Sequence, residues 1–382
     1  MRDIVILGST GSIGVQALEL VAANPDLFRV VGMSAGSGNL ELLFQQARKF
    51  QVPIVGTTAP RSAWEGFADG LAVIDGPSAS TEIAAISCDI VLNGINGSIG
   101  LGPTLSALAA GNKVALANKE SLVAGGPLVK AFGSDRIIPV DSEHSALFQA
   151  LLAGKRSEVK KFIITASGGA FRDRADLSGV TLQEALAHPT WSMGPMVTIN
   201  SATLMNKGLE IIEAHYLFDL PYSQIEAVIH PQSVIHSMVE FIDGSTIAQL
   251  SPPNMKGPIG YALNYPDRLK RSTSPVDWSQ GHSWNFAPVD ISRFPAIGIA
   301  RTAGESGSVS TATLNAANEV AVAAFIDGRI QFKDIVNVVE HTLTRVDSHG
   351  GGQVDVRDLD DVSAVELNAR MIAATYSEEL SR

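Results

Sequence analysis

Two carboxylates, Asp141 and Glu143, stand at the end of the apolar run 136–140, where they could hold a metal ion. An acid at the carboxyl end of a strand is costly unless water solvates it or a cation binds it. Oxygen ligands of this kind suit Mg²⁺ or Mn²⁺ rather than zinc. A helix N-cap followed by an acid in the first turn would explain the same residues, so the pattern leaves both interpretations open.

Asn118, Lys119 and Glu120 follow the apolar run 113–117 in the same way. Ligands of open α/β sheets bind at the carboxyl ends of the strands, so these side chains are expected to point toward a nucleotide crevice. Capping of the next helix by Asn118, with an acid in its first turn, is an equally good explanation.

Two further segments offer hydrogen-bond donors to a phosphate group. A Ser-Gly-Gly turn at 167–169 exposes backbone amides, although a simple turn explains it equally well. Ser201, Asn206, Lys207 and Glu210 surround one short helix, on which residues four apart share a face. Ser201 and Lys207 could bind phosphate, and Glu210 could be a third ligand of a cation. A capped helix with a solvated polar face is the commoner situation for such residues.

The segment 188–194 combines a histidine, a tryptophan and a methionine in a stretch that also contains proline and is followed by proline. A proline-bounded loop with an exposed aromatic side chain resembles a lid that excludes water from a site. The alternative is a hydrophobic anchor that packs the loop onto the core, and the residues alone favour that alternative.

A glycine-rich turn, Gly8-Ser-Thr-Gly11-Ser-Ile-Gly14, follows the apolar run 3–7 and opens a helical pattern. Glycines in this place allow a tight turn, and the helix N-terminus offers amide donors to a pyrophosphate, so the pattern predicts a dinucleotide site. The second apolar run ends in small polar residues over 34–39, without the acid that holds the ribose of NAD. This favours NADP.

The elements that must position these residues begin with an alternating pattern over the first 140 residues. Continuous apolar runs that alternate with helical stretches indicate a parallel sheet covered on both faces. We therefore expect a doubly wound, Rossmann-type α/β domain over 1–140. The predicted strands are 3–7, 29–33, 53–55, 71–74, 89–92, 113–117 and 136–140.

The pattern changes after residue 140. Residues 141–250 mix helices with longer strands, and Asp243-Gly244 predicts a hairpin, so this part is expected to be an α+β catalytic domain. Residues 251–295 hold seven of the eighteen prolines and are expected to form a linker. Residues 296–382 contain helical patterns and no proline, which predicts a C-terminal helical domain.

The amino-acid composition argues against nucleic acid and membranes as binding partners. The 382 residues carry a net charge of −11, which argues against nucleic acid because phosphate backbones need a basic face. The single cysteine cannot form an internal disulfide, which favours the cytoplasm. No apolar stretch reaches the length of a membrane span, so a membrane partner is not expected.

Eight ordered motifs together closely resemble the 1-deoxy-D-xylulose 5-phosphate reductoisomerase family of the non-mevalonate isoprenoid pathway. They are GSTGSIG at 8–14, ANKE at 117–120, PVDSEHSA at 139–146, ASGGAF at 166–171, HPTWSMG at 188–194, NSATLMNKGLE at 200–210, IHPQSVIHSMVE at 229–240 and LNAANEVAVAAF at 314–325. The resemblance covers almost the whole chain.

The resemblance implies a homodimer that uses NADPH and a divalent cation, Mg²⁺ or Mn²⁺ with Co²⁺ as a further candidate. The reaction it implies rearranges 1-deoxy-D-xylulose 5-phosphate to a branched aldehyde and reduces that aldehyde to 2-C-methyl-D-erythritol 4-phosphate. By the same resemblance, the metal ligands would be Asp141, Glu143 and Glu210.

The resemblance also assigns substrate and cofactor residues. The catalytic and substrate-binding residues would be Lys119, Ser142, Glu143, Ser167, His188, Trp191, Ser201, Asn206, Lys207 and Glu210, with Met193 and His236 in a second layer. The NADPH-binding residues would be Thr10, Gly11, Ser12, Ile13, Gly36, Asn39, Asn118, Glu120 and Gly194. One departure concerns Asn200, which stands where many members carry Asp.

Two other functions compete with this one. A dehydrogenase of the aspartate-semialdehyde type would need Cys88 as its nucleophile, and no histidine lies near Cys88 in the sequence. An inactive NADP-binding sensor would tolerate loss of the three carboxylates, which are all present.

Overall fold

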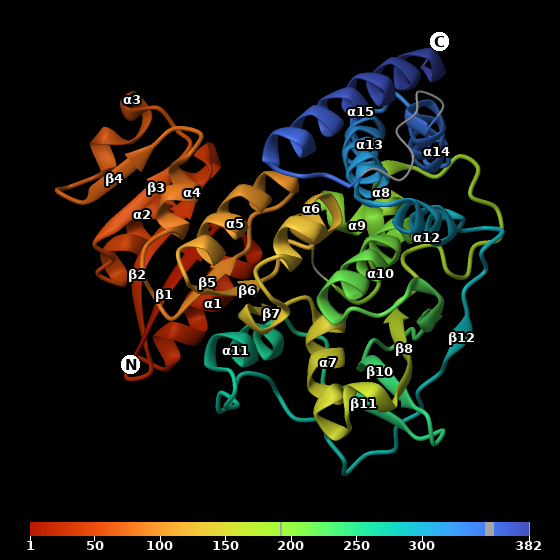
Figure 1. The fold of residues 1–382 in the computed structure, drawn as a ribbon, viewed down its shortest axis with the longest axis horizontal. Helices are drawn as coiled ribbons and strands as arrows, with labels where there is room; N and C mark the ends of the chain where they lie inside the picture. The colour runs from red at the N-terminus through yellow and green to blue at the C-terminus, as the bar shows by residue number, and fades with distance from the viewer. Residues whose placement is uncertain (192, 348–354, 382) are drawn as a thin grey trace. The chain divides into compact units, whose positions relative to one another are not determined.

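The computed structural model describes residues 1–191, 193–347 and 355–381. Its chain divides into two compact units, each built from several stretches of sequence. The first unit comprises Met1–Ser121, Val129–Ser145 and Asn254–Ser274, and the second comprises Leu122–Leu128, Ala146–Pro253 and Pro275–Arg382. Each unit has its own sheet (Figure 1).

The first unit contains a seven-stranded parallel sheet in the order β4-β3-β2-β1-β5-β6-β7. Each predicted apolar run corresponds to one strand, which confirms the doubly wound fold. The strands are β1 (Arg2–Leu7), β2 (Phe28–Ala35), β3 (Ile54–Thr57), β4 (Ala72–Asp75), β5 (Ile90–Asn93), β6 (Lys113–Leu116) and β7 (Ile137–Pro139). The chain reverses direction across the sheet between β1 and β5, and at such a switch point the carboxyl ends of the strands leave a ligand crevice.

Helices cover this sheet because its central strands are apolar on both faces. Helix α4 packs on β1 to β4 and beside α5, whereas α11 packs beside α1 and on β6 and β7 (Figure 1). The bounds are α1 (Ser12–Ala23), α2 (Leu40–Lys49), α3 (Arg61–Trp64), α4 (Ala79–Ala84), α5 (Leu101–Ala109) and α11 (Lys256–Asn264). Helices α6 (Glu120–Lys130) and α7 (Ser142–Ala150) contribute residues to both units.

The second unit contains a mixed five-stranded sheet in the order β11-β10-β8-β9-β12. The strands are β8 (Val159–Ala166), β9 (Ile225–Ile229), β10 (Ile235–Phe241), β11 (Thr246–Leu250) and β12 (Ala287–Pro288). Strands β10 and β11 are antiparallel, and Gly244 between them has φ +86°, so the predicted hairpin is confirmed. Strands β8 and β9 are parallel.

The C-terminal helices belong to this second unit. They are α12 (Ala296–Ser306), α13 (Ser308–Ile326), α14 (Asp334–Asp347) and α15 (Leu359–Leu380), and they follow α8 (Leu182–Leu186), α9 (Pro195–Ala202) and α10 (Met205–Phe218). By length and composition α13 could cross a membrane, but 72% of its apolar window is buried against neighbouring helices, as in the core helix of a globular domain.

The proline-rich segment 251–295 differs from the expected linker. It contains helix α11, and the stretch Asn254–Ser274 belongs to the first unit. The Arg2 guanidinium donates to the carbonyl oxygens of Leu263 (3.1 Å) and Tyr265 (2.8 Å), which fixes the end of α11 to the start of β1. Pro258 lies in the first turn of α11, where a missing N–H removes no helical hydrogen bond.

Candidate active site

The glycine-rich turn lies between β1 and α1. Gly8 has φ +76°, and a Cβ there would lie 2.7 Å from the carbonyl oxygen of Gly94, so only glycine fits. A Cβ on Gly14 would lie 2.4 Å from the Gly8 carbonyl oxygen, so α1 begins in close contact with the strand. The predicted residues Thr10, Gly11, Ser12 and Ile13 form this turn and the start of α1. The geometry suits a pyrophosphate at the helix N-terminus.

Two other predicted cofactor residues lie beside the next strand. Gly36 and Asn39 are exposed in the loop after β2, at the same edge of the sheet as the glycine turn. The Asn39 side chain caps α2 by accepting from the Leu42 amide (3.2 Å). No acidic side chain lies in the 36–39 loop, and the 2′-phosphate preference stays a prediction.

The Asn118 side chain joins the loop after β5 to the start of α6 through hydrogen bonds. Its side-chain amide donates to the carbonyl oxygens of Ile95 and Gly97, each at 2.8 Å, and to Glu120 at 2.9 Å. Its Oδ1 accepts from the backbone of Ser121, which caps α6. The capping interpretation of this residue is therefore confirmed, and Asn118 also fixes the loop after β5.

Asp141 and Glu143 lie at the carboxyl end of β7 and the start of α7, with ligand oxygens within 4.8 Å of one another. The Glu143 amide donates to Asp141 Oδ1 (3.3 Å), so the N-cap interpretation is also confirmed. Ser142 donates to Glu143 Oε2 at 2.5 Å. The paired carboxylates are the oxygen ligands that a hard cation prefers.

The Lys119 ammonium lies 2.7 Å from Asp141 Oδ2, and His144 Nδ1 lies 3.4 Å from Oδ1. Burial raises the pKa of Asp141, but Lys119 and His144 outweigh burial and hold that pKa well below its usual range. Asp141 is therefore ionised at neutral pH, as a metal ligand must be.

Ser167 and Ser201 belong to segments that are in direct contact within the second unit. Gly169 has φ +68°, and a Cβ there would lie 2.5 Å from the carbonyl oxygen of Ser201 and 2.9 Å from the Cα of Ala202. The Ser-Gly-Gly turn after β8 therefore packs against the backbone at the end of α9 without room for a methyl group. The absence of a Cβ at position 169 is what brings the two predicted phosphate-binding segments together.

His188 orients Ser167. Its Nδ1 accepts from the backbone amides of Thr190 (3.1 Å) and Trp191 (2.9 Å), which assigns the proton to Nε2. Nε2 lies 3.0 Å from Ser167 Oγ, which also accepts from the Gly169 amide at 3.2 Å. The Ser167 hydroxyl therefore receives two hydrogen bonds, and its own proton can be donated to a ligand. Burial, with Arg172 nearby, lowers the pKa of His188 and favours this neutral form.

The predicted flap begins at His188 and leads into α9. The Trp191 ring lies 6.1 Å from the ring of His236, whose Nε2 lies 3.1 Å from the Ser251 carbonyl oxygen. Gly194 caps α9, and Thr198 donates to its carbonyl oxygen at 2.9 Å and to that of Met193 at 3.4 Å. Ser192, within the same motif, lies outside the described residues.

Asn206, Lys207 and Glu210 lie on one face of α10. The Asn206 amide donates to Glu210 Oε1, and the Lys207 ammonium donates to Glu210 Oε2. Lys207 and Glu210 are buried. The shared face predicted from the spacing is confirmed, but Lys207 and Glu210 on that face are buried rather than solvated, and Asn206 is half-buried.

Sequence reasoning did not single out Asn318 of α13, although it lies in one of the quoted motifs. Its Nδ2 donates to Asn200 Oδ1 of α9 at 3.0 Å, and both side chains are buried. The Asn318 Oδ1 atom is buried without a hydrogen-bond partner among the described residues. The contact joins the helix that carries Ser201 to the core helix of the C-terminal region, across 118 positions of sequence.

Cys88 does not resemble a nucleophile. Burial raises the pKa of its thiol to about 11, so the thiolate is scarce at neutral pH. The dehydrogenase of the aspartate-semialdehyde type therefore receives no support from this residue.

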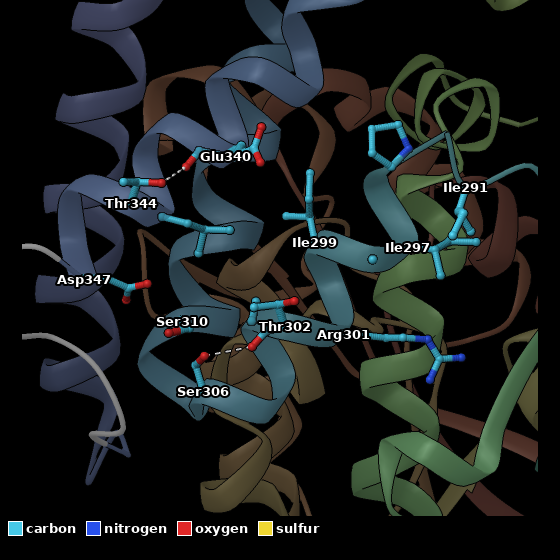
Figure 2. Close-up of a pocket in the computed structure, with 14 residues that line it drawn as sticks. Ile291, Ile297, Ile299, Arg301, Thr302, Ser306, Ser310, Glu340, Thr344 and Asp347 are labelled. Atoms are coloured by element: carbon cyan, nitrogen blue, oxygen red, sulfur yellow. Dashed lines mark hydrogen bonds between the residues drawn. The ribbon is translucent and has the colours of Figure 1, made fainter. Parts of the chain in front are cut away.

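A groove of about 630 Å³ lies elsewhere in the second unit, between α12 and α14. Figure 2 shows Thr302 and Ser306 of α12 on one side and Glu340 and Thr344 of α14 on the other. The guanidinium of Arg301 donates to backbone carbonyl oxygens, which fixes it in place. None of the predicted site residues lines this groove.

Comparison with known proteins places these residues in a family. Three family models match: 1-deoxy-D-xylulose 5-phosphate reductoisomerase over residues 4–126, its C-terminal domain over 137–218, and the DXP reductoisomerase C-terminal domain over 250–372. The 1-deoxy-D-xylulose 5-phosphate reductoisomerase of Beutenbergia cavernae is 54% identical over 379 residues, which covers 97% of this chain and 95% of that protein.

Solved structures agree with the sequence comparison. A crystal structure of DOX-P reductoisomerase in complex with NADPH, fosmidomycin and magnesium is 36% identical, with a TM-score of 0.91 over 100% of this chain and 99% of that one. The enzyme of Zymomonas mobilis in complex with NADPH is 39% identical, with a TM-score of 0.90 over 99% of this chain and 100% of that one. The chain thus belongs to the 1-deoxy-D-xylulose 5-phosphate reductoisomerase family.

Proposed function

We propose that this protein converts 1-deoxy-D-xylulose 5-phosphate to 2-C-methyl-D-erythritol 4-phosphate, with NADPH as the reductant and Mg²⁺ or Mn²⁺ as the required cation. The observation that carries the proposal is family membership at 54% identity over 97% of the chain. Relatives of known structure bind NADPH and magnesium. The carboxylate pair Asp141–Glu143 and the glycine turn at 8–14 fit these two groups chemically.

Asp141, Glu143 and Glu210 would hold the cation, because each offers a hard oxygen ligand. A bound divalent cation supplies Lewis acidity at the substrate oxygens where charge develops, and NADPH supplies the hydride. Lys119 keeps Asp141 ionised through the 2.7 Å contact and would donate to the same substrate oxygens.

Ser167, Ser201, Asn206 and Lys207 would bind the substrate phosphate. The Ser167 hydroxyl is oriented to donate because His188 and the Gly169 amide already occupy its acceptor positions. A tightly held phosphate supplies binding energy far from the reacting carbons, which positions the sugar for rearrangement. The segment 188–194 would close over the bound sugar and keep the aldehyde from water and from escape.

We also propose a homodimer formed along β11. This strand lies at the edge of the five-stranded sheet, and Thr246, Ile247 and Ala248 are exposed. An open edge with an exposed apolar side chain favours pairing with a second chain. Sedimentation velocity should show a dimer that Ile247→Lys weakens; an unaltered dimer in that variant would place the interface elsewhere.

A cytoplasmic location completes the proposal. A single cysteine cannot form an internal disulfide, so the fold does not depend on an oxidising compartment. Burial also raises the pKa of this thiol to about 11. Fractionation of cells that produce the protein should recover it with cytoplasmic markers, and recovery with membranes would contradict this assignment.

The loss of NADPH absorbance in the presence of 1-deoxy-D-xylulose 5-phosphate tests the activity. The protein, stripped of metal by a chelator, should oxidise NADPH only after Mg²⁺ or Mn²⁺ is restored. Asp141→Asn should bind NADPH normally but turn over at least 100-fold more slowly, since it removes a charged ligand. Turnover without a divalent cation, or none in folded protein that binds NADPH and metal, would overturn the proposal.

A further inference from the structure

Gln46 is a polar side chain on the buried face of α2. Its neighbours Leu43, Phe44 and Ala47 are apolar and fully buried, and Gln46 itself is only 7% exposed. A buried amide is costly unless its polar atoms find partners. The Gln46 Oε1 atom has no hydrogen-bond partner among the described residues. The packing of α2 therefore does not explain why an amide, rather than an apolar side chain, occupies this position.

The Gln46 amide nitrogen donates to the Ser9 carbonyl oxygen at 3.0 Å. Ser9 belongs to the glycine-rich turn between β1 and α1 and is fully buried. Within the part of the chain that the structure describes, no other group donates to this carbonyl oxygen. A carbonyl oxygen can only accept, so the nitrogen of the Gln46 amide must face it. One side chain of α2 thus satisfies a buried carbonyl group of the turn.

Strand β2 holds the turn at the preceding peptides. The amides of Gly8 and Ser9 both donate to the carbonyl oxygen of Ser34, at 2.8 and 2.9 Å. Neither hydrogen bond involves the peptide unit between Ser9 and Thr10. The orientation of that peptide unit is therefore set by the hydrogen bond from Gln46.

Anchoring this peptide unit fixes the direction of the Thr10 amide. A peptide unit is planar, and in its trans form the N–H points opposite to the C=O. The bond between Ser9 and Thr10 is trans. Because the carbonyl group is directed at Gln46, the Thr10 N–H points away from that side chain. It donates to no atom of the described residues, and Thr10 is only half-buried, so this N–H is available to a ligand.

We propose that Gln46 is a positioning residue for NADPH: through Ser9, it aims the Thr10 amide at the pyrophosphate of the cofactor. The inference rests on the proposed function, which supplies NADPH as the ligand of the turn. The same helix begins after Asn39, in the 36–39 loop that is expected to lie beside the ribose phosphate. Helix α2 thus links the two segments expected to hold the two phosphate groups of NADPH.

NADPH fluorescence titration tests the proposal without turnover. Gln46→Met keeps the length of the side chain and removes the donor to Ser9. We expect its Kd for NADPH to be about tenfold higher than that of the wild type, as for the loss of one well-placed hydrogen bond. Gln45→Met is the matched control, because Gln45 is exposed on the same helix and donates to Glu41 at 3.0 Å. An unchanged Kd in Gln46→Met, or an equal rise in Gln45→Met, would overturn the proposal.

A second ligand separates positioning of the turn from general damage to the fold. 2′-AMP carries the ribose phosphate but no pyrophosphate, and its displacement of bound NADPH reports its affinity. Gln46→Met should leave this affinity within about twofold of the wild-type value, since the missing hydrogen bond concerns only the pyrophosphate. Equal losses of affinity for NADPH and for 2′-AMP would show that Gln46 supports the domain as a whole, and would overturn the positioning role.

Urea unfolding first establishes that Gln46→Met folds cooperatively. If it does not fold, Gln46→Asn takes its place with the same expected results, because it keeps an amide but is one methylene too short to reach Ser9. Failure of the proposed function would look different. A folded wild-type protein that does not bind NADPH would refute the cofactor. A wild-type protein that binds NADPH no more tightly than Gln46→Met would refute the positioning role alone.

Discussion

Gly169 offers a sharp test of how the two proposed phosphate-binding segments are brought together. A left-handed conformation costs a residue with a Cβ about 1–2 kcal/mol relative to glycine. In Gly169→Ala the new Cβ would also meet the carbonyl oxygen of Ser201 at 2.5 Å and the Cα of Ala202 at 2.9 Å. Both atoms belong to the backbone, so no side-chain rotation relieves the collision, and overpacking adds about 1–3 kcal/mol.

Gly179 provides the matched control. It has φ +64°, close to the +68° of Gly169, but no atom lies within 4 Å of the position that a Cβ would occupy there. Gly179→Ala should therefore show the conformational cost alone, and the effect on unfolded-chain entropy is common to both variants. The difference between the two free energies of unfolding, about 1–3 kcal/mol, isolates the collision.

Urea unfolding and steady-state kinetics measure the two consequences. Gly169→Ala should unfold at a lower urea concentration than Gly179→Ala. Part of the collision is relieved by separation of Ser167 from Ser201, so the KM for the sugar phosphate should rise on the order of tenfold while NADPH affinity is unchanged. If the two variants match in stability and in KM, the close contact does not build the phosphate site.

Four further predictions concern separate residues. Glu210→Gln should bind NADPH normally but lose turnover by 100-fold or more, measured by NADPH fluorescence and oxidation; unchanged turnover would exclude a three-carboxylate metal site. Because the pKa of His188 is lowered in the folded protein, its neutral form, which accepts from the amides of Thr190 and Trp191, stabilises this segment above about pH 6.5, and this contribution is lost as the pH falls through the folded-state pKa. The KM should therefore rise in acid, and Arg172→Gln should shift that rise to higher pH; a flat profile of KM would contradict the assignment. Asn318→Leu removes the donor to Asn200 and should lower the free energy of unfolding, measured in urea, by about 1–3 kcal/mol. An unchanged free energy of unfolding would show that this hydrogen bond does not stabilise the fold. Cys88→Ser should leave kcat within about twofold, because a thiol with a pKa of about 11 does no chemistry at neutral pH, and loss of activity would revive the cysteine-dependent alternative.

The sequence predicted the first sheet well because its strands are buried on both faces. The stretches 4–7 and 90–92 are continuous in apolar, largely β-branched residues, and short runs of this kind between helical patterns are typical of buried strands. The carboxyl ends of β6 and β7 then placed Lys119 and Asp141 at one edge of the sheet, and the structure joins them at 2.7 Å.

Prolines bear on the prediction in two places. Pro195 bounds the loop as expected, and it also occupies the first position of α9, a helix that the sequence did not predict, where its fixed φ suits a helix start. Pro258 belongs to the first turn of α11 within the expected linker. Proline is disfavoured in the interior of a helix but is tolerated in its first turn. The proline content of a segment does not distinguish these two positions.

Contacts distant in sequence were beyond prediction for a different reason. Gly169 fits against Ser201 only because it has no Cβ. In the sequence, a Ser-Gly-Gly segment indicates a turn but does not indicate which distant residue packs against it. The hydrogen bond between Asn200 and Asn318 joins two helices whose own patterns carry no information about each other. Such pairings follow from the packing of the second unit, which local spacing does not encode.

The return of the chain to its first unit has a consequence for biosynthesis. Residues Ala146–Pro253 belong to the second unit, and Asn254–Ser274 then completes the first. At a synthesis rate of about 5–20 residues per second, the N-terminal sheet waits on the order of 5–20 seconds for α11 to leave the ribosome. During that interval Arg2 and Glu19 lack the partners that α11 supplies. A nascent chain halted after residue 145 therefore lacks the helix that completes its first unit.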